Sequence, residues 1–391
     1  MQGICLLGAT GSIGQSTLDI ISQHPDQFKL VCASANASVD KMADICRRFV
    51  PNRVVMGSEN ARDELAAKCP GLPISFEWGS EALDSIAADD NVDQVMAAIM
   101  GFAGLPPTIA GIRAKKRILL ANKESLVTAG KLFMDEVAKN DVTLLPIDSE
   151  HNAIFQSLPQ NAVGISKKHV QKLILTASGG PFRSWSLADM RNVSPEQACN
   201  HPNWSMGQKI SIDSASLMNK GLELIEACWL FDVTPADVDV VVHPESIIHS
   251  MATYVDGTVI AQMSNPDMKI PIAYGMTWPN RIETSVPPLD LVKIAQLNFE
   301  VPDINRFPNL KLASDAWYCG GTAMAILNAA NEVAVAAFLE KKIGFLDIAT
   351  INERTLNQVE RHAVESLDIV FSADKRARYS AEQIIATGAW L

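Results

Sequence analysis

The stretch that decides the fold is Gly8-Ala9-Thr10-Gly11-Ser12-Ile13-Gly14, which follows an apolar run at residues 4–7 and opens a helical pattern at 15–23. Glycines in this arrangement allow a tight turn, and they let a pyrophosphate approach the free N–H groups at the start of the helix. Because the motif joins a strand to a helix, it predicts a dinucleotide-binding domain. The alternative is a glycine turn that serves packing alone.

Outward from this motif, the first 150 residues alternate short apolar runs with helical patterns. The expected strands are residues 4–7, 28–34, 53–56, 94–100, 117–121 and 142–147. Continuous apolar strands joined by helices are typical of a parallel sheet covered on both faces, so we expect a Rossmann-like, doubly wound α/β domain. The second strand ends Cys32-Ala33-Ser34-Ala35-Asn36, with no acid to hold a ribose 2′-hydroxyl, which favours NADP over NAD.

The pattern changes after residue 150. Strands are expected at 172–176, 238–243, 247–255 and 258–263, where Asp256-Gly257 signals a tight hairpin, and a helix is expected at 216–230. This second unit is predicted to be α+β with an antiparallel sheet. Seven of the 20 prolines fall between residues 266 and 308, which indicates an extended linker, and helical patterns follow at 322–342 and 347–365. We therefore expect domains at 1–148 and 149–277, a linker at 278–308 and a C-terminal helical domain at 309–391.

Composition excludes several classes of protein. The chain has 391 residues, is 48% hydrophobic and carries a net charge of −11, which argues against a general nucleic-acid binder. The longest apolar run, residues 95–105, is shorter than the roughly 20 residues that span a bilayer, and no basic segment precedes Ile4, so we expect neither a membrane protein nor a signal peptide. Seven scattered cysteines without a C-x-x-C pair favour a reducing cytoplasm.

Carboxylates at the end of the sixth strand form a candidate metal site. In Asp148-Ser149-Glu150, alternate side chains of an extended segment would share one face, at the strand end where open α/β sheets bind ligands. Two hard oxygen donors suit Mg²⁺ or Mn²⁺. A solvated acidic turn is the alternative.

Two further segments could hold a phosphate. Asn219, Lys220 and Glu223 share one side of a predicted helix, with Ser214 and Ser216 just before it as expected caps. A surface salt-bridge face would give the same spacing. Ser178-Gly179-Gly180-Pro181, after the strand at 172–176, is either a second phosphate turn or an ordinary type II turn.

A loop with the composition of a lid lies between these segments. Ser194-Pro195-Glu196-Gln197 predicts a helix start with a capping box. His201-Pro202-Asn203-Trp204-Ser205-Met206-Gly207 follows it and combines aromatic rings with a flexible glycine. We expect a water-excluding lid over about residues 194–210, and a plain docking loop is the alternative.

Together these segments closely resemble the 1-deoxy-D-xylulose 5-phosphate reductoisomerase family. The matching stretches run in order from residue 8 to about 339: GATGSIGQSTLDII, LLANKESLVTAG, LLPIDSEHNAIFQSLP, TASGGPFR, HPNWSMGQKISIDSASLMNKGLELIEA, PESIIHSM and LNAANEVAVAAFL. The resemblance implies an enzyme that rearranges the ketose phosphate on a divalent metal (Mn²⁺, Mg²⁺ or Co²⁺). It then reduces the aldehyde with NADPH to 2-C-methyl-D-erythritol 4-phosphate, in the methylerythritol phosphate route to isoprenoids. It also implies a homodimer.

The resemblance assigns residues to each role. The metal ligands would be Asp148, Glu150 and Glu223. The residues that contact the substrate would be Lys123, Ser149, Ser178, His201, Trp204, Met206, Ser214, Asn219 and Lys220, beside the acids Glu150 and Glu223; Lys123 and His201 would join the acids as catalytic residues. The cofactor would contact Thr10, Gly11, Ser12, Ile13, Asn36, Ala37, Ser38, Asn122, Glu124 and Gly207.

This sequence departs from the family at one point. Many members carry a Gly-Lys-Asn-like triplet after the second strand, whereas Asn36-Ala37-Ser38 has no basic residue there. The preference for NADPH over NADH should therefore be narrower than in relatives with a lysine.

The sequence lacks the features that two rival functions would need. A semialdehyde or ester-phosphate dehydrogenase would need an activated cysteine beside a histidine, and no cysteine has that setting. A nucleotide-sensing regulator would have no reason to carry the three acids beside a phosphate grip.

Overall fold

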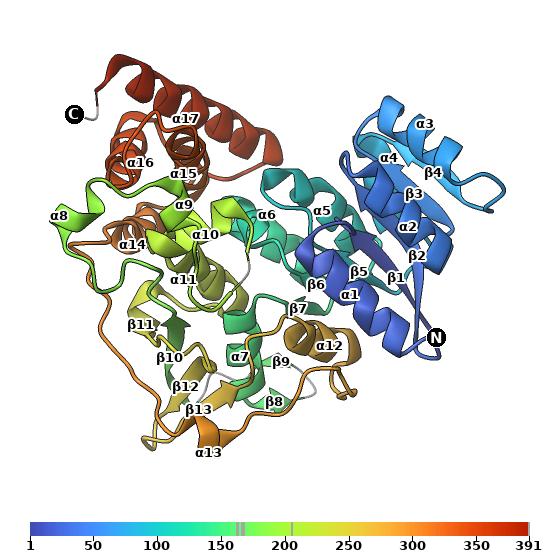
Figure 1. Ribbon diagram of the computed structural model, residues 1–391, viewed down its shortest axis with the longest axis horizontal. Helices are drawn as coiled ribbons and strands as arrows, with labels where there is room; N and C mark the ends of the chain where they lie inside the picture. Colours follow the sequence, from blue (N-terminus) through green and yellow to red (C-terminus); the bar gives the residue numbers. More distant parts are fainter. Residues whose placement is uncertain (162–163, 166–168, 205, 390–391) are drawn as a thin grey trace. The chain divides into compact units, whose positions relative to one another are not determined.

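The computed structural model describes residues 1–161, 164–165, 169–204 and 206–389 (Figure 1). The chain divides into two compact units. The first comprises Met1–Ser125, Phe133–Asn152 and Asp267–Pro287, and the second comprises Leu126–Leu132, Ala153–Pro266 and Pro288–Leu391. The chain therefore passes repeatedly from one unit to the other, and the expected boundaries at 148, 277 and 308 stay a prediction.

A seven-stranded parallel sheet forms the centre of the first unit, in the order β4-β3-β2-β1-β5-β6-β7. The strands are β1 (Gln2–Leu7), β2 (Phe28–Ala35), β3 (Arg53–Met56), β4 (Ser75–Trp78), β5 (Gln94–Ala97), β6 (Arg117–Leu120) and β7 (Leu144–Pro146). The expected Rossmann-like sheet is confirmed. Only β4 escaped the sequence analysis, because this edge strand is half-exposed and lacks an apolar run.

Helices cover the sheet of the first unit. They are α1 (Ser12–Gln23), α2 (Val39–Phe49), α3 (Glu59–Lys68), α4 (Ser80–Ala87), the 3₁₀ turn η1 (Phe102–Gly104), α5 (Leu105–Arg113) and α12 (Lys269–Thr277). Two further helices, α6 (Lys123–Asn140) and α7 (Ser149–Ser157), are each divided between the two units. Helix α6 departs from helical geometry at Ala129, within the part that is counted with the second unit.

Helix α12 corrects one expectation, because it lies in the proline-rich stretch that was predicted to be extended. It packs on α1, β6 and β7. Gly275 lies so close to Ile147 that a Cβ there would be 2.7 Å from its Cδ1, and the carbonyl of Met276 accepts from Gln94 Nε2 at 2.9 Å. The stretch thus returns to the first unit and packs on its sheet.

A four-stranded sheet in the order β11-β10-β12-β13 forms the second unit's β layer. Its strands are β10 (Val170–Ala177), β11 (Val238–Val242), β12 (Ile248–Tyr254) and β13 (Val259–Met263), and β8 (Gln160–Asn161) and β9 (Gly164–Ile165) pair separately. The hairpin at Asp256-Gly257 is confirmed, with Gly257 at φ +86°. The all-antiparallel expectation is wrong: β10 pairs parallel with β11 and antiparallel with β12, so the sheet is mixed.

Helices make up most of the remainder of the second unit. Before the linker they are α8 (Leu187–Met190), α9 (Pro195–Ala198), α10 (Gln208–Ala215), α11 (Met218–Phe231) and the 3₁₀ turn η2 (Pro235–Asp237); the linker holds the short α13 (Leu291–Ile294). The C-terminal helices are α14 (Asn309–Cys319), α15 (Ala323–Leu339), α16 (Asp347–Gln358) and α17 (Leu367–Thr387). The alanine-rich α15 packs against α14, α16 and α17, as the orange and red helices of Figure 1 show. Within the described ranges, no helix has the length and apolar character needed to cross a membrane.

Gly14→Ala should destabilise the first unit. A Cβ at residue 14 would lie 2.4 Å from the carbonyl oxygen of Ala9, and neither backbone can move aside without separating α1 from β1. Overpacking of this kind costs about 1–3 kcal/mol, so the thermal unfolding midpoint should fall by several degrees. Gly11→Ala in the same turn is the control, because its Cβ would meet Gly8 O at an ordinary 3.5 Å. Equal midpoints for the two variants would contradict the close approach.

Candidate functional site

The predicted cofactor residues other than Gly207, which belongs to the second unit, lie at the carboxyl ends of parallel strands in the first unit. Gly8 takes a positive φ of +86° directly after β1, and its N–H donates to Ser34 Oγ of β2 at 3.1 Å. Gly11 then caps α1, whose first residues are exposed. The N-terminal N–H groups of α1 are thus presented where the turn allows a phosphate to approach. The residues that carry this surface are Thr10, Gly11, Ser12 and Ile13.

The triplet Asn36-Ala37-Ser38 follows β2 at the same edge of the sheet. All three residues are exposed, and Ser38 is the N-cap of α2. The carbonyl of Asn36 accepts from the N–H of Gly57 at 2.9 Å, which fixes the backbone of this turn against the end of β3. A charge placed at position 37 would project to solvent at the cofactor edge.

Asn122 joins β6 to α6 and is almost fully buried. Its Oδ1 accepts from the N–H of Ser125 at 3.3 Å as the N-cap of α6, and its Nδ2 donates to the carbonyl of Gly101 at 2.8 Å. Its side chain therefore ties together two loops at the sheet edge. Glu124, in the first turn of α6, is also buried. The family resemblance implies that Asn122 contacts the cofactor and says nothing of this cap, although Asn directly before a helical run is a cap signal.

The acidic pair follows β7. Asp148 forms an ion pair with Lys123 of α6, and the side chains of both are mostly buried. Ser149 Oγ donates to Glu150 Oε2 at 2.6 Å. The expected extended segment is wrong here, because Ser149 and Glu150 already lie in the first turn of α7 and the carbonyl of Asp148 accepts from the N–H of Asn152. The two acids are therefore positioned by a strand end followed by a helix start.

In the second unit, Ser178 follows β10 and contacts His201. The Nδ1 atom of His201 accepts from the N–H groups of Asn203 at 3.2 Å and Trp204 at 3.0 Å, so the proton of the neutral ring lies on Nε2. Nε2 then donates to Ser178 Oγ, 2.8 Å away, and Gly180 N also donates to this oxygen. The hydroxyl hydrogen of Ser178 is thereby directed to a further acceptor. An anion could accept this hydroxyl hydrogen.

The loop that contains His201 is held at both ends. The predicted capping box at Ser194 and Gln197 is confirmed, and Gly207 caps α10. Asn203 Nδ2 donates to Pro244 O at 2.6 Å and to Ser246 Oγ at 2.8 Å. Asn203 was missed as a positioning residue, since its partners lie more than forty residues away in the sequence. Ser205, within the expected lid, lies outside the described residues.

An indole ring and a thioether belong to the same loop. Trp204 packs edge-on against His249 with ring centroids 6.1 Å apart. Met206 is half-buried, and Gly207 is exposed with no atom within 4 Å of a Cβ placed on it.

Helices α10 and α11 carry the remaining residues. The expectation that Ser214 caps the following helix is wrong, because Ser214 lies inside α10. Ser216 is the C-cap of α10, and its hydroxyl accepts from the N–H of Met218, the first residue of α11, at 3.5 Å. Leu217, with a φ of +57°, is the N-cap position of α11. A Cβ on Gly180 would lie 3.0 Å from Ser214 O, so the turn after β10 meets the end of α10.

The grouping of Asn219, Lys220 and Glu223 on one face of α11 is confirmed. Asn219 Nδ2 and Lys220 Nζ each donate to one carboxylate oxygen of Glu223. Lys220 is 3% exposed and Glu223 is 0% exposed. The exposed salt-bridge face that the spacing also allowed is therefore excluded.

The cysteines do not support thioacyl chemistry. Cys5, Cys32, Cys46, Cys69 and Cys228 are buried, and all seven are free. Burial raises the pKa of Cys46 and that of Cys228 to about 12, and it also raises the pKa of Cys199. Thiols whose pKa is raised form little thiolate, the nucleophilic species, at neutral pH.

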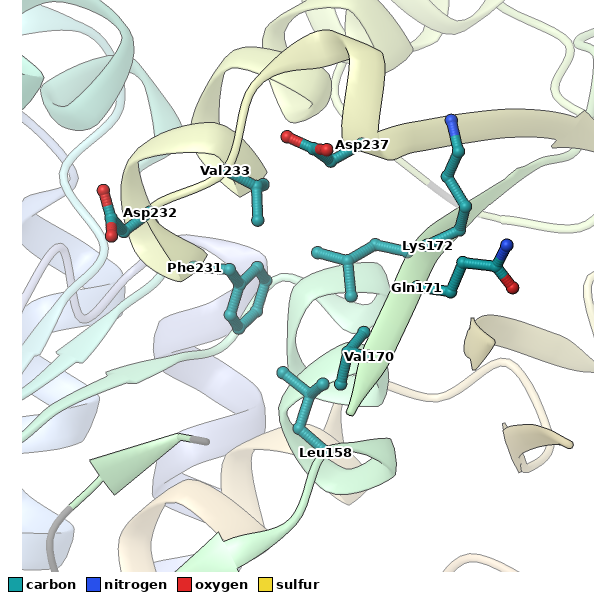
Figure 2. Close-up of a pocket in the computed structure, with 9 residues that line it drawn as sticks. Leu158, Val170, Gln171, Lys172, Phe231, Asp232, Val233 and Asp237 are labelled. Carbon is teal, nitrogen blue, oxygen red and sulfur yellow. The ribbon is translucent and has the colours of Figure 1, made fainter. Parts of the chain in front are cut away.

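A cavity of about 250 Å³ lies elsewhere in the second unit, between the start of β10 and the end of α11 (Figure 2). Figure 2 shows an apolar floor that includes Leu158, Val170 and Phe231, with Lys172 and Asp237 at the rim. None of the predicted site residues lines it.

Comparison with known proteins covers nearly the whole chain. The sequence profile of 1-deoxy-D-xylulose 5-phosphate reductoisomerase matches residues 4–130, and the profiles of two C-terminal domains of that enzyme match residues 144–231 and 263–380. A 1-deoxy-D-xylulose 5-phosphate reductoisomerase from Ralstonia nicotianae is 54% identical over 390 residues, covering 99% of this chain and 98% of the relative. One from Pseudomonas aeruginosa is 55% identical over 385 residues, covering 98% and 97%.

Solved structures agree with these relatives. The Zymomonas mobilis enzyme in complex with NADPH has a TM-score of 0.92 and 47% identity, covering 98% of this chain and 99% of that one. A DOX-P reductoisomerase in complex with NADPH, fosmidomycin and magnesium has a TM-score of 0.93 and 46% identity, covering 99% and 98%. Sequence and fold together show that the chain belongs to the 1-deoxy-D-xylulose 5-phosphate reductoisomerase family.

Proposed function

We infer that this chain carries out the reaction of its family: it converts 1-deoxy-D-xylulose 5-phosphate to 2-C-methyl-D-erythritol 4-phosphate with NADPH and Mg²⁺. The observation that carries this inference is the pairing of two kinds of site on one chain. The first unit presents a dinucleotide turn and two carboxylates at one sheet edge, and the second presents a buried Lys–Asn–Glu face with a Ser–His pair. Relatives of 46% and 47% identity bind NADPH, and the former also binds magnesium.

The cofactor residues would act mainly through the backbone. The turn Thr10–Ile13 offers the pyrophosphate the N–H groups of α1, and Asn36, Ala37 and Ser38 face the ribose 2′-phosphate. Asn122 and Glu124 hold the end of β6 near the nicotinamide, while Gly207, without a side chain, lets the lid approach the cofactor. The hydride for the reduction comes from NADPH.

The donor set fits a divalent metal. Asp148, Glu150 and Glu223 are a group of carboxylates that could hold an ion, and hard oxygen donors are what Mg²⁺ and Mn²⁺ prefer. Asp148 and Glu223 form ion pairs with Lys123 and Lys220 respectively, so a bound divalent ion would share these carboxylates with the two ammonium groups or displace them. A divalent ion bound there would hold substrate oxygens and polarise the carbonyl as a Lewis acid.

The chain's own groups would hold the substrate at its two ends. Ser178 donates its hydroxyl hydrogen to the phosphate, with His201 Nε2–H keeping the hydroxyl oriented. Lys220, Asn219 and Ser214 supply further donors from the corner between α10 and α11. Lys123 and Ser149 contact the sugar hydroxyls, and Lys123 can stabilise negative charge that develops on an oxygen during the rearrangement.

The loop at 194–210 would close over the bound sugar. Trp204 and Met206 supply apolar cover that excludes water, and the ring of Trp204 already packs on His249. Because Asn203 is anchored to the loop at 244–246, the movement would be carried by the neighbouring segment that ends at Gly207.

A homodimer in the cytoplasm is the state we propose. Strand β13 is an edge of its sheet and exposes Val259 and Ile260, and the linker exposes Val292 and Val301, each 90% accessible. Exposed apolar side chains gathered on edges and linkers are typical of subunit interfaces. The seven free cysteines suit a reducing compartment.

Turnover itself is the first test. The purified chain should oxidise NADPH when both 1-deoxy-D-xylulose 5-phosphate and Mg²⁺ are present, and chelation of the metal should stop the reaction. The loss of NADPH absorbance measures the rate, and NMR of the product identifies 2-C-methyl-D-erythritol 4-phosphate. A chain that consumes no NADPH under these conditions lacks the proposed function.

Glu223→Gln should abolish most activity while the fold survives. The amide keeps the shape of the side chain and can still accept from Lys220, but it removes the charge that a metal needs. Since residues outside a ligand set already cost about 10- to 100-fold when mutated, loss of a ligand should lower kcat by about 100-fold or more. Electron paramagnetic resonance titration should show weaker Mn²⁺ binding, with NADPH affinity unchanged.

Asp239→Asn is the matched control for this substitution. It removes an acid whose side chain is 59% exposed on β11 of the same unit, and Mn²⁺ affinity should stay at the wild-type value. Normal turnover and a normal Mn²⁺ titration for Glu223→Gln would remove Glu223 from the metal site.

Ala37→Lys should widen the preference for NADPH over NADH. The exposed position can place an ammonium beside the 2′-phosphate, and a charge-assisted contact at a solvent-exposed site is worth about 1 kcal/mol, or roughly fivefold in kcat/KM. Gln27→Lys is the control, because Gln27 is exposed at the opposite end of β2. The ratio of kcat/KM for the two cofactors decides; a ratio that rises equally in both variants points to general charge instead.

A further inference from the structure

We propose that three buried asparagines of the C-terminal helices position the substrate's phosphate grip. They are Asn309 of α14, Asn331 of α15 and Asn352 of α16, and they reach the corner between α10 and α11 that carries Ser214, Asn219 and Lys220. They touch neither substrate nor cofactor in this proposal and act through that corner. The inference rests on the proposed function, since it assumes that the corner binds the phosphate.

The asparagines form a continuous chain of hydrogen bonds that starts at a buried anion. Asp213 of α10 pairs with Lys209 at 2.9 Å, and Asn331 Nδ2 donates to Asp213 Oδ1 at 2.8 Å. Asn352 Nδ2 donates both to Asn331 Oδ1 at 3.2 Å and to Asn309 Oδ1 at 3.1 Å. Asn309 Nδ2 then donates to the carbonyl of Ser216 at 3.4 Å.

The carboxylate of Asp213 determines the direction of every bond in this chain. An ionised carboxylate only accepts, so Asn331 must turn its NH₂ group toward Asp213 and its oxygen toward Asn352. Asn352 has two amide hydrogens, and both are used by the oxygens of its neighbours. The amide of Asn309 is thereby left facing Ser216 with its NH₂ group. The charge of Asp213 therefore orients the amides of three asparagines, and the last of them, Asn309, donates to the carbonyl of Ser216.

The carbonyl of Ser216 lies at the turn between α10 and α11. Ser216 ends α10, and Leu217 takes a positive φ of +57° before α11 begins at Met218. The hydrogen-bonded asparagines thus contact α10 at the carboxylate of Asp213 and at the carbonyl of Ser216. These two residues lie on either side of Ser214. A Cβ on Gly221 would lie 3.2 Å from Asn309 O, so α14 also contacts the first turns of α11, where Asn219 and Lys220 lie.

Because these four side chains are buried, their hydrogen bonds allow few alternative arrangements. Asp213 and Asn309 are 1% exposed, and Asn331 and Asn352 are 0% exposed. A buried amide that loses its partner has no water to replace it, so the arrangement tolerates few alternatives. Apolar side chains could fill the same space without fixing a direction. The polar chain gives the corner one position relative to α15 and α16.

The test compares Asn352→Ala with Asn328→Ala. Asn328 lies on α15, is 0% exposed and donates to Glu332 of its own helix at 3.1 Å, so it matches the burial without reaching α10. Asn352→Ala should raise KM for 1-deoxy-D-xylulose 5-phosphate about tenfold, as expected when a phosphate contact is misplaced by the loss of a buried hydrogen-bond network. Its KM for NADPH and its kcat/KM for 1-deoxy-D-xylulose, which lacks the phosphate, should match the wild type.

A purely structural role predicts a different result. Both variants would then lower the unfolding midpoint and the active fraction, and so kcat, with KM for the phosphorylated substrate unchanged. That outcome overturns the proposal, as does an equal loss with the sugar that lacks phosphate. Asp213→Asn is the second variant should Asn352→Ala fail to fold, because it keeps the shape and removes only the charge that sets the direction. It should also raise KM for the phosphorylated substrate, and an unchanged KM would overturn the proposal.

The activity of the wild-type chain distinguishes a failure of the proposed function from a failure of the positioning role. A wild-type chain that is inactive with the phosphorylated sugar contradicts the proposed function. An active wild type with unchanged KM values in these variants contradicts only the positioning role of the asparagines.

Discussion

A carboxylate with no exposed surface constrains the second unit more than any other group. Glu223 is stable there because Lys220 and Asn219, from the same helix, reach its two oxygens. An unpaired charge at this depth would cost several kcal/mol, so α11 can neither rotate nor lose its lysine without a large penalty. Residues 220–228 of α11 are all buried, so this ion pair lies inside a helix that is packed on every side. Gly221 then lets α14 approach the opposite side closely, since a Cβ there would meet Ala313 at 2.7 Å.

Much of the fold could be predicted because its signals are local. The glycine turn after β1, the helix that follows it and the capping box at Ser194 each depend on residues that are neighbours in the sequence. The parallel pairing of β10 with β11 could not be predicted in this way, because sixty residues separate the strands and only the β12–β13 hairpin has a turn signal. Helix α10 was missed as well: its sequence QKISIDSA has two serines and no side-chain cap.

In the candidate site, too, the features that depend on neighbouring residues could be predicted and those that depend on distant residues could not. Residue types and spacing placed Asn219, Lys220 and Glu223 on one face of a helix, which the structure confirms. They could not reveal that Glu223 is buried, nor that a helix begins at Ser149 and so includes Glu150. The hydrogen bonds among the asparagines of the C-terminal helices could not be predicted from the sequence. Each asparagine lies more than twenty residues from the next, and no sequence signal marks their amides as partners. Their roles in the reaction, and those of the remaining site residues, stay predictions.

The return of α12 to the first unit has a consequence for synthesis of the chain. Strands β6 and β7 and Gln94 of β5 are covered or hydrogen-bonded by residues 269–277, which leave the ribosome long after Pro146. At about 5–20 residues per second, the sheet waits on the order of ten seconds with part of one face uncovered. During that interval the second unit's strands and α10–α11 are already being made. The first unit therefore cannot be completed as one contiguous N-terminal piece, and a nascent chain has to keep this apolar face from other partners until residues 269–277 emerge.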